Sequence, residues 1–182
     1  MTTIINLYCG PGGGKSTTSA FLFYLLKSSG LNAEMVREYV KEWAWEGRVP
    51  SAFDQIYLLG KQVRKESMLL GKVDYVVTDC PVLIGSLYAQ KFCPKVIKDG
   101  VVELSKGYYQ YCADQGHKHI HVVLNRTKEY NPKGRYQTEE EAKKIDGELT
   151  DLIKDFGFDM IQSGTSEQEL RNLFSCIVSN SG

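Results

Sequence analysis

The chain has 182 residues with 22 basic and 22 acidic side chains, so its formal net charge is zero and no overall field attracts it to nucleic acid or to anionic membranes. Its hydrophobic content of 42% can fill one core, and the length predicts a single domain over residues 1–182. The five cysteines form no C-x-x-C pair and no apolar run approaches the ~18 residues of a membrane span, so we expect a cytoplasmic protein without a disulfide framework or a structural zinc site.

The first predicted strand, residues 3–9, runs into a glycine-rich loop, and an apolar helix over residues 16–27 follows. The loop sequence YCGPGGGKST (residues 8–17) is typical of a phosphate-binding loop, because glycines let backbone N–H groups point inward and the helix N-terminus adds partial positive charge. Lys15 would reach the β- and γ-phosphates, and Ser16 would hold Mg²⁺. The predicted phosphate contacts are Gly10, Gly12, Gly13, Gly14, Lys15, Ser16 and Thr17.

One position departs from the pattern G-x-x-x-x-G-K-[ST], since Cys9 stands where the pattern has its first glycine. The alternative interpretation is a glycine-rich turn that binds nothing. Such a turn needs neither a lysine and a hydroxyl directly after the last glycine nor a strand before it and a helix after it. We therefore favour nucleotide binding.

The rest of the chain alternates between predicted strands and helices. Strands are predicted over residues 32–36, 74–81, 119–125 and 158–161. Helices are predicted over 51–70 with Ser51 as N-cap, 83–90, 95–113, 138–156 and 166–178, the last two opened by the capping boxes Thr138/Glu141 and Ser166/Glu169. This order predicts an α/β fold with a parallel sheet of about five strands, helices on both faces and ligands at the carboxyl ends of the strands.

Charged side chains follow the strands at that edge. Asp79 ends the third strand, where a carboxylate can hold Mg²⁺ or take a proton from an attacking hydroxyl; the alternative is a helix N-cap before Pro81. Arg37 and Glu38 follow the second strand, and Glu38 could bind sugar hydroxyls or act as the base in place of Asp79. The alternative for this pair is a surface ion pair.

Aromatic side chains form three further groups. Tyr39 and Trp43 lie four residues apart and could stack on a planar base, although core packing is the commoner use of such rings. Three tyrosines are expected in packing or oligomer contacts, which keeps a homo-oligomer open: Tyr108, Tyr109 and Tyr111. Three histidines alternate along a strand with no nearby carboxylate or cysteine to complete a metal site, so we expect them at the surface: His117, His119 and His121.

Residues 125–138 have no apolar period and are too long for a simple connector, so we predict a lid. Arginines that closure brings in could stabilise the charge that develops in phosphoryl transfer, while the closed lid excludes water. The candidates there are Arg126 and Arg135, which join Lys15 and Asp79 as the predicted catalytic residues. The alternative is a solvated basic loop.

Three motifs resemble the ribosylnicotinamide kinase domain of the bifunctional bacterial NAD-biosynthesis regulator and related phage kinase-like AAA ATPases: the loop over 10–17, the segment REYV over 37–40, and FDQIYLLGKQ over 53–62 leading to Asp79. The resemblance covers most of the chain. It implies a P-loop NTPase three-layer sandwich with a lid loop, ATP and Mg²⁺ as cofactors, Asp79 working with the acceptor hydroxyl, and the REY segment facing the substrate.

Two departures concern the acceptor. Cys9 replaces the first loop glycine, and the lid carries Lys133-Gly134-Arg135 where the family has an acid before the glycine. The acceptor therefore need not be nicotinamide riboside.

Our leading hypothesis is an ATP-dependent kinase that phosphorylates a hydroxyl of a nucleoside or nucleotide-like small molecule, with substrate contacts from Arg37, Glu38, Tyr39 and Trp43 and Mg²⁺ held by Ser16 and Asp79. One alternative is a kinase acting on a hydroxymethylated base in DNA. Another is a nucleotide-dependent ATPase switch with a protein partner.

Overall fold

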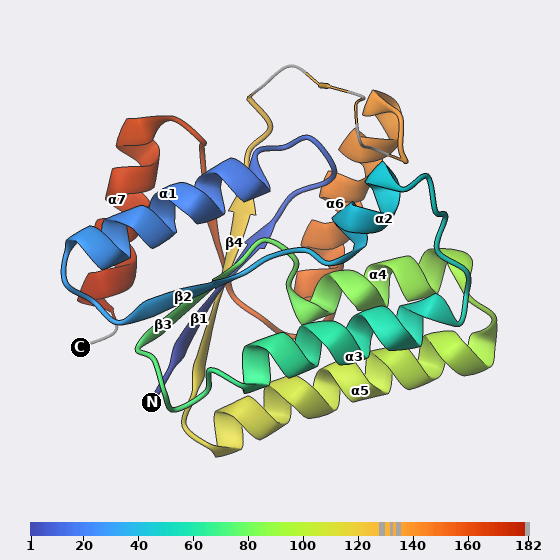
Figure 1. The fold of residues 1–182 in the computed structure, drawn as a ribbon, viewed down its shortest axis with the longest axis horizontal. Coiled ribbons are helices and arrows are strands. Elements are labelled where there is room, and N and C mark those ends of the chain that lie inside the picture. Colours follow the sequence, from blue (N-terminus) through green and yellow to red (C-terminus); the bar gives the residue numbers. More distant parts are fainter. Residues whose placement is uncertain (128–129, 132, 134–135, 181–182) are drawn as a thin grey trace.

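The computed structural model describes residues 1–127, 130–131, 133 and 136–180. The described residues form a sheet of five parallel strands in the order β2-β3-β1-β4-β5 (Figure 1). The strands are β1 (Thr3–Tyr8), β2 (Ala33–Val36), β3 (Tyr75–Thr78), β4 (Lys118–Leu124) and β5 (Met160–Ser163). All six residues of β1 are buried, as expected for a central strand covered on both faces.

Helices cover both faces of the sheet and complete three layers (Figure 1). They are α1 (Lys15–Ser28), α2 (Val40–Trp45), α3 (Asp54–Ser67), α4 (Val82–Phe92), α5 (Lys95–Asp114), α6 (Glu139–Asp155) and α7 (Glu167–Ser179). On one face Ile5 and Leu7 of β1 pack with residues of α1 and α7, while on the other Tyr8 packs with residues of α3, α4, α5 and α6. The predicted α/β sandwich is confirmed.

The capping predictions had mixed outcomes. The boxes Thr138/Glu141 and Ser166/Glu169 open α6 and α7 as expected. The prediction of Ser51 as the N-cap of the third helix is wrong, because α3 begins at Asp54. The Asp54 carboxylate reaches back to accept the Ser51 N–H at 2.7 Å and pairs with Arg48 at 2.9 Å.

The last strand begins two residues later than predicted, at Met160. The Phe158 N–H donates to the Ile153 carbonyl of α6 at 3.1 Å, so this residue still belongs to the end of the helix. Its ring packs on His121 and Tyr109, with centroids 4.4 and 4.9 Å apart.

The expectation that the alternating histidines lie at the surface is wrong for His119 and His121. His121 is 4% exposed, and its Nδ1 lies 2.8 Å from Tyr8 Oη. Burial lowers the pKa of His119 to about 3 and that of His121 to about 4, so both rings are neutral near pH 7. Alternate residues of a strand inside the sheet face the helix layer, where Tyr109 is buried as predicted.

Candidate active site

The glycine-rich loop joins β1 to α1 at the carboxyl edge of the sheet. Gly12 and Gly14 have φ values of 79° and 99°, a left-handed backbone conformation that residues other than glycine rarely adopt. Gly14 is the N-cap of α1. The first-turn N–H groups of α1, from Lys15 to Thr17, have no helix carbonyl to donate to, so they remain to bind an anion at the loop.

Cys9 and Gly13 fit together across the loop. A Cβ added at Gly13 would lie 1.7 Å from Cys9 Sγ, so the thiol occupies space that only a glycine at position 13 leaves. Burial raises the pKa of Cys9 to about 12, which keeps the thiol protonated. The departure from the loop pattern at Cys9 is thus matched by a second residue within the same loop.

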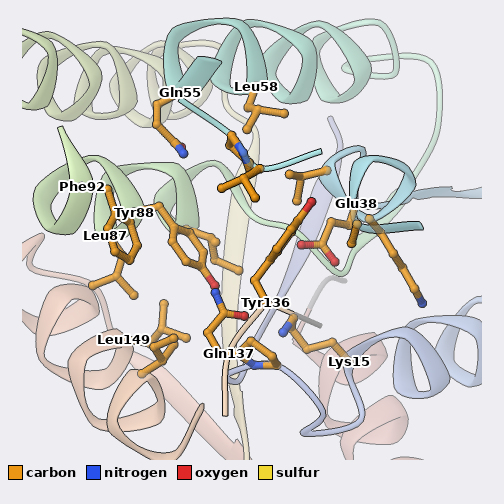
Figure 2. Close-up of a pocket in the computed structure, with 18 of the residues that line it drawn as sticks. Lys15, Glu38, Gln55, Leu58, Leu87, Tyr88, Phe92, Tyr136, Gln137 and Leu149 are labelled. Atoms are coloured by element: carbon orange, nitrogen blue, oxygen red, sulfur yellow. The ribbon is translucent and has the colours of Figure 1, made fainter. Parts of the chain in front are cut away.

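Lys15 folds back across the loop. Its Nζ donates to the carbonyl oxygen of Cys9 and, at 3.4 Å, to that of Gly10. Its side chain also lines a cavity of about 240 Å³ (Figure 2). The ammonium group is therefore at the boundary between the loop and the cavity.

This cavity extends away from the loop between α2, α3, α4 and α6. Lys15 and Glu38 lie at one end of it, while Leu87, Phe92 and Leu149 lie at the other (Figure 2). Its other polar lining includes Lys41, Gln55, Tyr88, Tyr136 and Gln137. A cavity with apolar walls and a few polar groups is typical of a site for a small organic molecule.

Asp79 and Glu38 come from the ends of the neighbouring strands β3 and β2. Asp79 is 3% exposed, and its Oδ1 accepts the backbone N–H of Glu38 at 2.8 Å. The N-cap position of α4 is Pro81, so the alternative interpretation of Asp79 as a helix N-cap is wrong. Glu38 lines both the large cavity and an adjoining cavity of about 50 Å³.

The other residues predicted to contact substrate have different surroundings. Tyr39 lines the smaller cavity, and its Oη lies 3.2 Å from Tyr57 Oη. Arg37 is exposed, and neither it nor Trp43 is among the described residues that line the two cavities. Trp43 is 5% exposed because Tyr57 stacks on one side and the Arg48 guanidinium lies 3.5 Å from its ring centroid.

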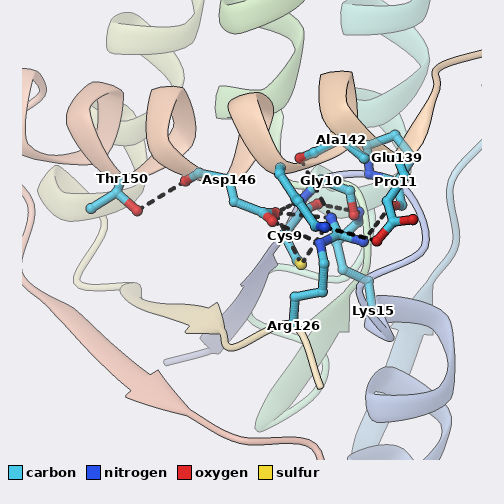
Figure 3. A network of polar contacts seen from close by, with 10 residues as sticks. Cys9, Gly10, Pro11, Lys15, Arg126, Glu139, Ala142, Asp146 and Thr150 are labelled. Carbon is cyan, nitrogen blue, oxygen red and sulfur yellow. Dashed lines mark hydrogen bonds and ion pairs between the residues drawn. The ribbon is translucent and has the colours of Figure 1, made fainter. Parts of the chain in front are cut away.

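Arg126 lies beside the phosphate loop and is held by α6. Its Nε and Nη2 donate to the two carboxylate oxygens of Asp146 at 2.9 and 3.2 Å, and its Nη1 donates to the carbonyl oxygen of Pro11 at 2.9 Å (Figure 3). The other predicted lid arginine, Arg135, lies outside the described residues.

Several residues of the site were missed from the sequence. Gln55 is 8% exposed and lines both cavities. No sequence signal marked it, because the buried face of α3 carries the polar Gln55, Gln62 and Glu66, while apolar residues such as Phe53 and Ile56 are exposed. Asp146 carried no signal either, since acidic residues are common along α6.

Residues 4–169 match the model of a family described as an AAA domain (AAA_28). The chain belongs to this family. The chain has no significant match among curated proteins. Within the described residues, every helix is too short or too polar to cross a membrane.

Solved structures share the fold at low sequence identity. The NadR protein in complex with NR matches with a TM-score of 0.74 at 17% identity, and its complex with NAD and AMP-PNP matches with 0.69 at 14%. Both cover all of this AAA-domain chain, which spans about half of the NadR chain (52% and 50%). Deoxyadenosine kinase from M. mycoides with bound dATP matches with 0.57 at 15%, covering 96% of this chain and 98% of that one. The fold is therefore the predicted P-loop NTPase sandwich, and the resemblance inferred from the three motifs is confirmed.

Proposed function

We propose that the protein is an ATP-dependent phosphotransferase that moves the γ-phosphate of ATP to a hydroxyl of a nucleoside or nucleotide-like small molecule. One observation carries the proposal: a single cavity joins the phosphate-loop lysine and a half-buried carboxylate to a chamber with mainly apolar walls. A hydrolytic switch needs the phosphate site but has no use for a second chamber opening onto it. The fold shared with nucleotide-bound proteins supports the same choice.

ATP would bind with its phosphates in the loop, against the first-turn N–H groups of α1 and the Lys15 ammonium. Ser16 and Asp79 offer a hydroxyl and a carboxylate, hard oxygen donors of the kind that Mg²⁺ prefers, so the residues fit this ion. When bound, Mg²⁺ would neutralise phosphate charge. We assign no cysteine chemistry to the loop, because the Cys9 thiol is buried and protonated.

Glu38 is the carboxylate that we assign to the acceptor hydroxyl, because it lines the cavity at the same end as Lys15. It takes the hydroxyl proton, the freed oxygen bonds to the γ-phosphorus, and the bond to the bridging oxygen breaks to release ADP. Asp79 holds the Glu38 backbone through its N–H and thereby positions that carboxylate. Arg135 in the lid remains a candidate for stabilising the transferred group.

The planar part of the acceptor would fill the chamber. The rings of Tyr88 and Tyr136 offer faces or edges for a heterocycle, and the amides of Gln55 and Gln137 can both donate and accept hydrogen bonds. A base carries such donors and acceptors on its edge. Tyr39, in the smaller adjoining cavity, extends the same wall.

The test measures ADP release with ATP and Mg²⁺ against nucleosides, nicotinamide riboside, nucleoside monophosphates, and unmodified and hydroxymethylated DNA, with products checked by mass. We expect one small-molecule acceptor to stimulate release and gain a phosphate. Lys15→Ala should abolish turnover, whereas the matched control Lys27→Ala, exposed in the last turn of the same helix, should not. Slow Lys15-dependent hydrolysis that no acceptor stimulates would overturn the proposal in favour of a switch.

The variants Glu38→Gln and Asp79→Asn distinguish the roles that we propose for the two carboxylates. Glu38→Gln should lower kcat by roughly 10²–10⁴-fold and leave ADP affinity unchanged, because it removes only the proton acceptor. Asp79→Asn keeps an oxygen for the Glu38 N–H, so its main effect should be a higher Mg²⁺ requirement. Full activity in Glu38→Gln would remove this residue from the mechanism.

A further inference from the structure

Asp146 of α6 contacts the phosphate loop from outside. Its Oδ1 accepts the backbone N–H of Gly10 at 2.5 Å and lies 3.2 Å from Cys9 Sγ (Figure 3). These two residues form the start of the loop, directly after β1. One carboxylate of a distant helix thus fixes where the loop begins.

The backbone of α6 also lies against the loop. A Cβ added at Gly10 would come within 2.3 Å of the carbonyl oxygen of Ala142, which precedes Asp146 by one helical turn on the same face. Only a glycine at position 10 permits this approach. The contact with α6 is therefore built into the loop sequence as well as into Asp146.

Arg126 links the phosphate loop to α6 through further hydrogen bonds. Its side chain is 10% exposed and donates to both Asp146 oxygens and to the Pro11 carbonyl. Its Nη2 also donates to the Ala142 carbonyl at 3.4 Å and lies 3.9 Å from Cys9 Sγ. All three guanidinium nitrogens are engaged by the loop and by α6.

The charges explain why both residues are present. A carboxylate beside a loop that binds a polyanion would repel the phosphates if it were unpaired. Arg126 cancels that charge while the Asp146 oxygen still holds the Gly10 N–H. The anchor and its neutralisation thus come from two different residues.

We propose that Asp146 and Arg126 are positioning residues for nucleotide binding: Asp146 anchors the phosphate loop, and Arg126 acts by neutralising and orienting Asp146 instead of by touching the transferred phosphate. This inference rests on the nucleotide site of the proposed function. It assigns a role to Asp146 and changes the role expected of Arg126.

The two roles for Arg126 predict opposite results in a double-mutant cycle. Arg126→Ala leaves the Asp146 carboxylate unpaired beside the phosphates, so ADP affinity should fall about tenfold or more. Asp146→Asn keeps an oxygen for the Gly10 N–H and removes the charge. The double variant Arg126→Ala/Asp146→Asn should therefore recover to within a few-fold of the wild-type affinity. If Arg126 instead binds phosphate directly, the double variant still lacks that contact, so its ADP affinity will stay well below that of the wild type even though the Asp146 charge is gone.

ADP affinity by isothermal titration calorimetry is the readout, with the thermal unfolding midpoint recorded for each variant. Asp151→Asn, an exposed acid on the same helix, is the matched control and should bind as the wild type does. If Arg126→Ala does not fold, Arg126→Gln replaces it in the cycle. Failure of the double variant to recover overturns this inference, whereas a wild-type protein that binds no ADP overturns the nucleotide site itself.

Discussion

Gly13→Ala should damage the phosphate loop because of one neighbour. The new methyl group would lie 1.7 Å from Cys9 Sγ and 2.9 Å from Cys9 Cβ, whereas ordinary contacts of such atoms are roughly 3.5–4 Å. The loop must move by about 2 Å or the thiol must leave its site. Overpacking of this kind costs about 1–3 kcal/mol. If the loop bears that strain when nucleotide binds, ADP affinity should fall roughly five- to a hundredfold.

A second substitution, at Cys9, should restore the ADP affinity that Gly13→Ala loses. Replacing Cys9 by glycine removes both clashing atoms and leaves the Gly10 carbonyl oxygen, at 3.3 Å, as the nearest neighbour of the new methyl. Cys9→Gly/Gly13→Ala should therefore bind ADP nearly as the wild type does, and Cys9→Gly alone should be nearly neutral. Titration calorimetry on the four proteins measures this. Wild-type affinity in Gly13→Ala, or a double variant as weak as Gly13→Ala, would refute the steric argument.

Two further predictions concern stability and the cavity. Burial raises the pKa of Glu66 from 4.5 to about 7, so the unfolded chain ionises first as pH rises. Wild-type stability should fall between about pH 4.5 and 7 relative to Glu66→Gln, as urea unfolding would show; parallel pH curves would contradict this. Tyr136 lines the cavity and donates its hydroxyl to the Arg48 carbonyl. Tyr136→Ala should raise the acceptor KM severalfold without changing ADP affinity, and an unchanged KM would exclude it from the acceptor site.

Local sequence signals predicted most of the fold. The loop glycines, the Thr138/Glu141 capping box and the apolar run of β1 each depend on residues close together in the chain. The closeness of Asp79 and Glu38 could also be predicted, because parallel strands end at one edge of the sheet and the residues that follow them gather there.

The errors and omissions depend on contacts between distant residues. Asp146 meets Gly10 across 136 positions of sequence, and nothing in α6 marks that acid among its neighbours. The tryptophan at position 43 was a stacking candidate by spacing, but Arg48 and Tyr57 cover its ring. His121 has a polar side chain and was expected at the surface, yet it lies on an internal strand and is buried among aromatic rings. Periodicity identifies a face but not the side chains that will cover it.

The carboxylates around the loop point to a division of the site. A pocket for a polyanion tolerates nearby acids only where other groups compensate them. Asp146 is compensated by Arg126 on the outer side of the loop, and buried Asp79 accepts the Glu38 N–H. Glu38 is the acid that reaches the cavity wall. The loop lysine Lys15 and the Glu38 carboxylate, which come from different segments of the chain, therefore line one cavity, and this is the arrangement that the proposed transfer to a hydroxyl would need.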